Sequence, residues 1–326
     1  MTDTHVGQQI VARLVINRRV ISPGVRWRRP DEPFWQLSTG AAIDEINERK
    51  PAFTIIKGDV TDNAAPDQFA RARHLLNRLK QPYHVVRGNH DWALEPFLKT
   101  FAMARSWYGF THKGMHFIVL DTEPLANEND PTIERELAWL ADELKQHGDQ
   151  WTFVFVHRPI QPALKRSSDS GLTGGLMDLG RAVAQRWYGP TAGHVYDIAM
   201  GRKPCVPEDR ARRVTALLRG HGRIAGVFAG HLHRNFVGYW PEQTGNMPYV
   251  ETASTKEYPC GYAITRVFTG GYMQNYYTPR DPECLEWSSM TRDAYVRIGF
   301  GSKIGSLADR NFVVKFDELN LTPVRK

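Results

Sequence analysis

Cysteine is scarce in this chain of 326 residues, in which only Cys205, Cys260 and Cys284 occur. Three cysteines at irregular spacing provide neither a disulfide framework nor the Cys-x-x-Cys pairs of a structural zinc site. The scarcity therefore excludes a disulfide-stapled scaffold and a thiolate metal site, and it favours a reducing compartment.

Long hydrophobic runs are also lacking. The apolar stretches reach about five to seven residues, whereas a membrane-spanning helix needs about 20. The start of the chain, MTDTHVGQQI, has neither the basic nor the apolar segment of a signal peptide. Repeats and low-complexity tracts are absent too, so we expect one main domain over residues 1–326, without a membrane span and in the cytoplasm.

Acidic residues are fewer than basic residues, and the formal net charge is +7. No acidic residue lies between Val6 and Pro30, and this stretch holds Arg13, Arg18, Arg19, Arg26, Arg28 and Arg29. An excess of positive charge favours anionic partners, namely phosphorylated small molecules, nucleic acid or a membrane surface. A solvated basic face explains these arginines as well as a substrate-binding surface does.

Helical and strand-like segments alternate over the first 230 or so residues. Apolar residues have helical spacing at 41–50, 67–80 and 132–146, and short β-rich runs lie at 52–56, 83–86, 116–120, 151–156 and 224–229. This alternation predicts an α/β sheet with crossover helices. The later sequence is strand-like and rich in turns, including YVRIGF at 295–300 and NFVVKF at 311–316, and predicts a second, largely antiparallel sheet.

A polar side chain follows each of the five β-rich runs. In chain order these side chains are Asp59, Asn89, Asp121, His157, and the pair His231 and His233. Open α/β sheets bind ligands in the crevice at the carboxyl ends of their strands. We therefore expect these side chains to meet at one edge of the sheet.

The chemistry of this set is that of a metal site. Carboxylate, amide oxygen and imidazole together suit divalent ions such as Mn, Fe, Zn or Co. Residues two apart in an extended chain lie on one face, so His231 and His233 can reach one centre, as can Asp3 and His5. Glycine before Asp59 lets the backbone turn sharply beneath an ion.

The order of these motifs resembles the five-block signature of the calcineurin-like metallophosphoesterase superfamily. The blocks here are Asp3-Thr4-His5, GDVTD at 58–62, GNHD at 88–91, His157, and GHLH at 230–233. The resemblance implies a four-layer α/β/β/α sandwich of two mixed sheets flanked by helices. It also implies a metal site at the carboxyl ends of the strands.

The family pattern implies two divalent metal ions, whose identity it leaves open among Mn, Fe, Zn and Co. The first ion would be held by Asp3, His5, Asp59 and His233, and the second by Asp59, Asn89, His157 and His231. Asp59 would bridge the two ions. A hydroxide between them would attack phosphorus in line.

His90 matches the catalytic histidine of the family. It would protonate the leaving oxygen or stabilise the phosphoryl oxygens, and Asp62 or Asp91 would orient its imidazole and hold it cationic. Asp121 would support the site from behind, although a cap on the following turn is an equal interpretation.

The first block stands at the very start of the chain. In the family a central apolar strand precedes this block, and no such strand precedes Asp3 here. We interpret the N-terminus as shortened, with an ordinary polar terminus as the alternative. Any export signal would then lie upstream of the sequence given. The cytoplasmic location is therefore expected from the given residues alone.

Two positions differ from those of other branches of the superfamily, and these differences narrow the range of expected activities. Purple acid phosphatases have tyrosine where Asp62 stands, and protein phosphatases have arginine where Asn63 stands. The remaining pattern resembles the bacterial phosphodiesterase branch. We expect an enzyme that hydrolyses phosphodiesters or phosphomonoesters, with a small phosphodiester or cyclic nucleotide favoured. The alternatives are a nuclease acting on DNA or RNA, and a non-catalytic scaffold; the oligomeric state stays open.

Substrate choice would depend on an insertion at 160–213, which we predict to form a cap. Its candidate phosphate or ribose contacts are Lys165, Arg166, His194, Arg202 and Lys203, and a flexible surface loop is the equal alternative. The remaining prediction is a C-terminal β extension at 290–326.

Overall fold

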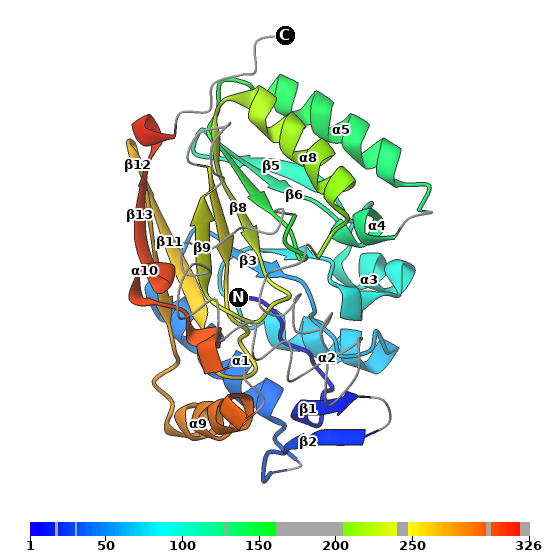
Figure 1. Cartoon of the computed structure of the whole chain (residues 1–326), viewed down its shortest axis with the longest axis vertical. Coiled ribbons are helices and arrows are strands. Elements are labelled where there is room, and N and C mark those ends of the chain that lie inside the picture. Colours follow the sequence, from blue (N-terminus) through cyan, green and yellow to red (C-terminus); the bar gives the residue numbers. More distant parts are fainter. Residues whose placement is uncertain are drawn as a thin grey trace.

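A computed structural model of the chain describes residues 1–16, 19–29, 31–127, 130–160, 205–239, 247–297 and 301–319 (Figure 1). Two packed layers of strands lie between two layers of helices. Three separate clusters of buried apolar side chains fill the spaces between these layers. The predicted four-layer α/β/β/α sandwich is therefore confirmed.

The larger sheet has six strands in the order β5-β6-β7-β8-β10-β9. Its parallel centre consists of β6 (Met115–Val119), β7 (Thr152–Phe155), β8 (Ile224–Ala229) and β10 (Pro248–Glu251). The edge strands β5 (Tyr108–His112) and β9 (Phe236–Tyr239) run antiparallel to their neighbours. Three consecutive parallel strands, β6 to β8, thus bring their carboxyl ends to one edge.

Neighbouring residues of these strands face two different cores. Ile118 and Val154 pack on the side of α5 (Ile133–Gln146) and α8 (Glu208–His221), which lie side by side over this sheet in Figure 1. Phe117 and Phe153 belong to the core on the opposite face. Successive side chains of a strand point to opposite faces, so strands that are apolar at consecutive positions must be covered on both sides.

The second layer of strands contains two small sheets. β3 (Thr54–Lys57) and β4 (Tyr83–Val86) are parallel. β11 (Tyr262–Phe268), β12 (Gly271–Tyr277) and β13 (Asn311–Lys315) form an antiparallel sheet. Tyr272 of β12 and Val314 of β13 join the core of Phe117 and Phe153, so the two strand layers pack face to face.

The outer helices on the other side share one core. They are α1 (Phe34–Arg49), α2 (Pro66–Leu76), α3 (Leu94–Phe101) and α9 (Pro282–Arg297), and the hairpin of β1 (Val11–Ile16) and β2 (Arg19–Val25) lies beside α9. Trp287 of α9 stacks on Phe34 of α1, with ring centroids 4.6 Å apart. The shorter helices are η1 (Asn89–Asp91), α4 (Thr122–Ala126), η3 (Gly301–Ile304), α10 (Leu307–Arg310) and η4 (Phe316–Glu318).

One predicted strand is wrong. The segment YVRIGF was expected to be a strand, but α9 continues through Arg297. Trp287, Thr291 and Tyr295 are all buried, and their spacing of four residues places them on one face of a helix. Of the predicted C-terminal β extension, the described residues contain β13, which confirms the strand expected at NFVVKF.

The predicted cap cannot be compared with the fold over most of its length. Residues 161–204, with all five of its candidate contacts, lie outside the described residues. Its described end, from Cys205 to Arg213, leads into and forms the first turns of α8. Among the described helices, none combines the length and apolar character that crossing a bilayer requires.

Candidate metal centre

The first six residues run alongside β3 and the loop that follows it. The Asp3 N–H donates to the Gly58 carbonyl at 3.0 Å, and the His5 N–H donates to the Asp59 carbonyl at 2.9 Å. On the other side, the Ser254 hydroxyl donates to the Asp3 carbonyl at 2.9 Å. The N-terminal segment therefore carries Asp3 and His5 to the carboxyl end of β3, where both side chains are buried.

The first predicted group of ligands comes together. The donor atoms of Asp3, His5, Asp59 and His233 all lie within 4.8 Å of one another. His233 Nε2 is 3.1 Å from Asp3 Oδ1, and His5 Nε2 is 3.4 Å from Asp59 Oδ2. His5 Nε2 is buried yet forms no hydrogen bond, as expected of a nitrogen that takes an ion as its partner.

The second group shares Asp59 with the first. Donor atoms of Asp59, His157 and His231 lie within 4.8 Å of one another. His157 Nε2 is 3.2 Å from Asp59 Oδ2 and 3.1 Å from Asn89 Oδ1. Asp59 is thus the carboxylate common to both groups, in the position that a bridging ligand requires.

Backbone strain is concentrated at these residues. Asp3, His5, Asp59, His231 and His233 all have positive φ angles, between 43° and 67°. Residues other than glycine seldom adopt this left-handed region, and such strain persists at functional sites where the surrounding structure enforces it. Glycine gives the necessary room at residue 88, where a Cβ atom would lie 2.2 Å from Asp59 Oδ1.

Hydrogen bonds fix the orientation of two histidines. His157 Nδ1 is 2.9 Å from the Lys57 carbonyl, and His233 Nδ1 is 2.6 Å from Glu257 Oε1. Both acceptors require a proton on Nδ1, so Nε2 of each ring is directed to the aspartates. Metal-binding histidines are commonly held in this way by a carbonyl or carboxylate on the other nitrogen. Lys303 Nζ, 2.9 Å from Glu257 Oε1, extends the network.

The buried carboxylates attract positive charge. Burial opposes the ionisation of Asp59, but the facing His157 and His5 hold its pKa well below its usual value. Burial likewise disfavours a charged His157, yet Asp59 and Asp3 raise the pKa of this histidine to about 10. A divalent cation would supply this charge in place of the proton, because metal binding displaces protons from its ligands.

His90 lies beside the shared aspartate. The main-chain N–H of His90 donates to Asp59 Oδ1 at 2.8 Å. Its ring Nδ1 is 2.5 Å from the main-chain oxygen of Asp62. The side chain of Asp62 turns instead to His5 Nδ1, at 3.3 Å. The main chain of Asp62, rather than its carboxylate, therefore orients His90.

Asp91 has a different role from the one expected. Its buried carboxylate accepts hydrogen bonds from the N–H groups of Val60, Thr61 and Gly88 and from the Thr61 hydroxyl. These bonds occupy both oxygens and join the loop after β3 to the turn after β4. Asp91 thus holds two ligand-bearing loops together instead of orienting the His90 imidazole.

Asp121 is both a cap and an ion-pair partner. Its Oδ1 accepts the Glu123 N–H at 3.1 Å, which caps α4, and its Oδ2 accepts the Arg87 Nε–H at 2.7 Å. The capping interpretation is therefore confirmed for this residue.

Sequence reasoning did not single out Arg158, Glu257 or Lys303. Arg158 Nη1 is 3.3 Å from His231 Nε2, and its Nε donates to Glu123 Oε1 at 2.9 Å. Its place directly after His157 is a signal that could have identified it. Glu257 and Lys303 lie 24 and 70 residues beyond His233, and no pattern in the sequence connects them with it.

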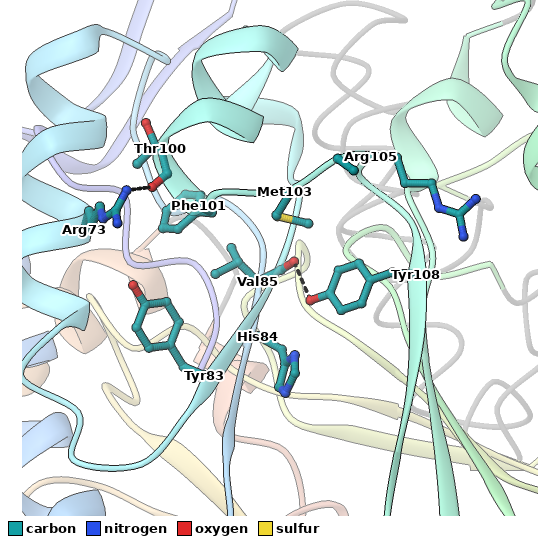
Figure 2. A pocket seen from close by; sticks show the side chains of 10 residues that line it. Arg73, Tyr83, His84, Val85, Thr100, Phe101, Met103, Arg105 and Tyr108 are labelled. Atoms are coloured by element: carbon teal, nitrogen blue, oxygen red, sulfur yellow. Dashed lines mark hydrogen bonds between the residues drawn. The ribbon is translucent and has the colours of Figure 1, made fainter.

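A separate pocket lies between β4, α3 and β5 (Figure 2). Its volume is about 400 Å³, and its lining includes Arg73, Tyr83, His84 and Tyr108. The Tyr108 hydroxyl donates to the Val85 carbonyl at 3.2 Å. None of the lining residues belongs to either ligand group, so the pocket is distinct from the candidate metal centre.

Comparison with known proteins agrees with this geometry. A profile of the calcineurin-like phosphoesterase family matches residues 1–235. The chain is 25% identical over 142 residues to the glycerophosphodiester phosphodiesterase GpdQ of Enterobacter lignolyticus, which is 40% of this chain and 51% of that protein. It is also 25% identical over 122 residues to a 3′,5′-cyclic-nucleotide phosphodiesterase of Nostoc, covering 36% of this chain and 46% of that protein. The matches thus span about half the length of these relatives.

A solved structure has the same fold. The dimetal phosphatase from Danio rerio superposes on this chain with a TM-score of 0.58 at 13% identity. The superposition covers 86% of this chain and 95% of that one.

Proposed function

Because the chain belongs to the calcineurin-like phosphoesterase family, we propose that it is a hydrolase of phosphoric esters that uses two divalent metal ions. We further propose that its substrates are small phosphodiesters, such as glycerophosphodiesters or cyclic nucleotides. The observation that carries the proposal is the shared position of Asp59 between two groups of donor atoms. The names of the relatives from Enterobacter and Nostoc support the choice of a small diester.

The described side chains fit two ions of the Mn, Fe, Zn and Co class. The first ion would be held by Asp3, His5, Asp59 and His233, and the second by Asp59, Asn89, His157 and His231. Oxygen and imidazole donors without thiolate suit these metals. When bound, the ions would polarise the phosphoryl oxygens and supply an activated water for in-line attack.

His90 would handle the proton of the leaving group. Its Nδ1–H donates to the main-chain oxygen of Asp62, which leaves Nε2 as the nitrogen that can face the ester. General acid catalysis needs an imidazole held within hydrogen-bonding reach of the departing oxygen. The contacts of His90 with Asp62 and Asp59 fix its position relative to the shared carboxylate.

Arg158 would bind the phosphoryl group. Its guanidinium contacts both His231 and Glu123, and its side chain is 22% exposed, so Arg158 lies at the border between the centre and solvent. Arginine donates paired hydrogen bonds that match the geometry of phosphate oxygens. In this role it would orient the ester against the second ligand group.

The two alternatives have less support. A nuclease would use the N-terminal arginines to follow a phosphate backbone, but Arg28 pairs with Glu286 and Arg29 with Glu283 of α9. These ion pairs already neutralise part of the basic stretch. A non-catalytic scaffold would be expected to lack ligands, whereas all seven predicted ligand positions carry donor residues.

Asp59→Asn tests the proposal directly. We expect the variant to lose turnover of bis-p-nitrophenyl phosphate, glycerophosphocholine and cyclic AMP while keeping the wild-type circular dichroism spectrum. Asp209→Asn, an exposed change on α8, is the matched control and should keep full activity. Full turnover by Asp59→Asn would contradict the shared role of this carboxylate. Higher turnover of single-stranded DNA than of small diesters by the wild type would favour the nuclease.

A further inference from the structure

A second cluster of metal-binding side chains lies at the other end of the six-stranded sheet. His116 is the second residue of β6, whereas the candidate metal centre lies beyond the carboxyl ends of β6, β7 and β8. Asp121 stands five positions after His116, which corresponds to roughly 16 Å along an extended strand. The cluster is therefore separate from the centre that we propose to be catalytic.

Three donor atoms converge in this cluster. His116 Nε2 is 3.1 Å from Glu143 Oε1, and His147 Nε2 is 3.8 Å from the same oxygen. The donor atoms of the three residues lie within 4.8 Å of one another. Glu143 and His147 are one helical turn apart at the end of α5, so both face β6.

The Nε2 atom of His116 lacks a hydrogen bond. The residue is 1% exposed, and its Nδ1 is 3.2 Å from the hydroxyl of Thr111, its partner across the β5–β6 hairpin. Nε2 is buried without a hydrogen-bond partner, although Glu143 is close.

The neighbouring strand makes room for the carboxylate. A Cβ atom at Gly109 of β5 would lie 2.1 Å from Glu143 Oε1 and 3.0 Å from His116 Cε1. Only glycine permits the carboxylate and the imidazole to lie this close to the strand. The carboxyl end of a helix also favours positive charge, and Glu143 and His147 stand at that end of α5.

His116 and His147 are stacked, and this arrangement gives the two rings different roles in binding an ion. His116 and His147 stack with centroids 3.8 Å apart and an angle of 10° between planes. An ion lies near the plane of each imidazole that binds it, so both rings can bind one ion only if one of them tilts. The side chain of His147 is 27% exposed and has room to tilt. His116 and Glu143 therefore form the fixed part of the cluster, and His147 completes it.

His221, whose ring contacts the His147 carbonyl, is already engaged. Its Nε2 donates to the His147 carbonyl at 3.1 Å, and its Nδ1 accepts the Arg223 N–H at 3.2 Å. Both nitrogens are thus used, so His221 is not a further ligand, and among the residues that the structure describes the cluster has three.

We propose that His116, Glu143 and His147 bind one transition-metal ion of the zinc class, which fastens the end of α5 to β6. Two imidazoles and a carboxylate, with water in the fourth position, make a common tetrahedral zinc site. The imidazoles argue against Mg²⁺ and Ca²⁺, which prefer oxygen ligands. The ion is too far from the proposed catalytic centre to take part in ester hydrolysis.

The zinc content of His147→Ala tests this assignment. The full-length wild type, stripped with chelator and reloaded with zinc, should hold about three zinc ions per chain, and His147→Ala about two. His74→Ala, which removes an exposed histidine of α2, is the matched control and should keep the wild-type content. Added zinc should raise the melting temperature of His147→Ala less than that of the wild type. Phosphoesterase activity should be the same in all three proteins.

Glu143→Gln provides a second variant, because its amide removes the charge without removing the side-chain volume. It should lose the same equivalent of zinc as His147→Ala. Equal zinc content in the wild type and both variants would overturn the proposal. The comparison does not depend on the catalytic centre, because its failure to bind metal would lower the zinc content of all these proteins alike.

Discussion

Glu257 Oε1 lies 2.6 Å from His233 Nδ1, on the side of the ring opposite to Asp3. This pairing makes Glu257 the residue that fixes a predicted metal ligand without contacting the ion. Glu257→Gln should weaken metal binding by roughly 10- to 100-fold, because the amide holds the imidazole less firmly and reduces its basicity. The metal concentration for half-maximal activity measures the effect, with exposed Glu48→Gln on α1 as control. An unchanged metal requirement would show that His233 does not depend on Glu257.

His90→Ala should separate catalysis from metal binding. The variant should lose roughly 100- to 10,000-fold in kcat while keeping its metals, since His90 belongs to the proposed proton path and not to the proposed ligands. Steady-state rates and metal analysis on the same preparation check this, and His74→Ala is the control. Parallel loss of metal and rate would instead identify His90 as a ligand.

Arg158→Ala should reduce kcat/KM for small diesters by roughly 30-fold, the equivalent of about 2 kcal/mol for a charge-assisted hydrogen bond. Arg158→Lys should recover only part of this loss, because an ammonium group cannot donate the paired bonds of a guanidinium. Glu123→Gln serves as a comparison, since it removes the charge that holds Arg158. Wild-type kcat/KM in Arg158→Ala would exclude a substrate contact.

Asp91→Asn should lower the free energy of unfolding by about 1–3 kcal/mol, because an NH₂ group would face backbone N–H donors in a buried place. Urea denaturation of the metal-free protein measures the loss, and Asp209→Asn is the surface control. A stability equal to that of the wild type would mean that the four hydrogen bonds of Asp91 are not needed to join the loops.

His84 should make the fold sensitive to acid. Burial lowers the pKa of His84 to about 4, and its ring stacks on Phe110 with centroids 3.8 Å apart. The folded-state pKa is below the unfolded value of about 6.5, so the unfolded state binds more protons between these values. The stability from neutral His84 is present above pH 6.5 and is lost as the pH falls toward 4.

Urea denaturation at pH 7.5 and pH 5 measures this effect. The two pKa values correspond to about 2 kcal/mol over this interval, which solvent screening of the partly exposed ring reduces, so the wild type should lose about 1–2 kcal/mol more than His84→Gln. Exposed His74→Gln should behave as the wild type. Identical losses in the wild type and His84→Gln would refute the assignment.

The sequence carried the local information for the sheet and for most ligand positions. Strands such as TFVF at 152–155 are apolar at consecutive residues, which predicts burial on both faces, and β7 is buried between two cores. Asp59, Asn89, His157, His231 and His233 could be predicted because each follows such a strand, whereas Asp3 and His5 precede the first described strand and were predicted from their spacing and the family resemblance. Asp59 and Asn89 come after the parallel pair β3 and β4, and His157, His231 and His233 come after β7 and β8, so it is the packing of the two strand layers that brings these ligands together.

The sequence pattern does not predict the bond to the Asp62 main chain, the contact of Glu257 with His233 or the helical end of α9. Every residue has a main-chain oxygen, so the identity of residue 62 could not predict the bond from His90 to the Asp62 carbonyl. Glu257 reaches His233 through tertiary packing. The apolar residues of YVRIGF fit a strand locally, but Tyr295 packs in one core with Trp287 and α9 extends through Arg297; residues 298–300 lie outside the described residues.

The bond between the Ser254 hydroxyl and the Asp3 carbonyl joins residues 251 positions apart. One of the contacts that hold the main chain of Asp3 in place thus comes from the last third of the polypeptide. During synthesis the first ligand group would stay open until that region has left the ribosome, because His233 and Ser254 emerge so late. Completion of the first ligand group therefore requires that the chain has been made and folded at least as far as Ser254.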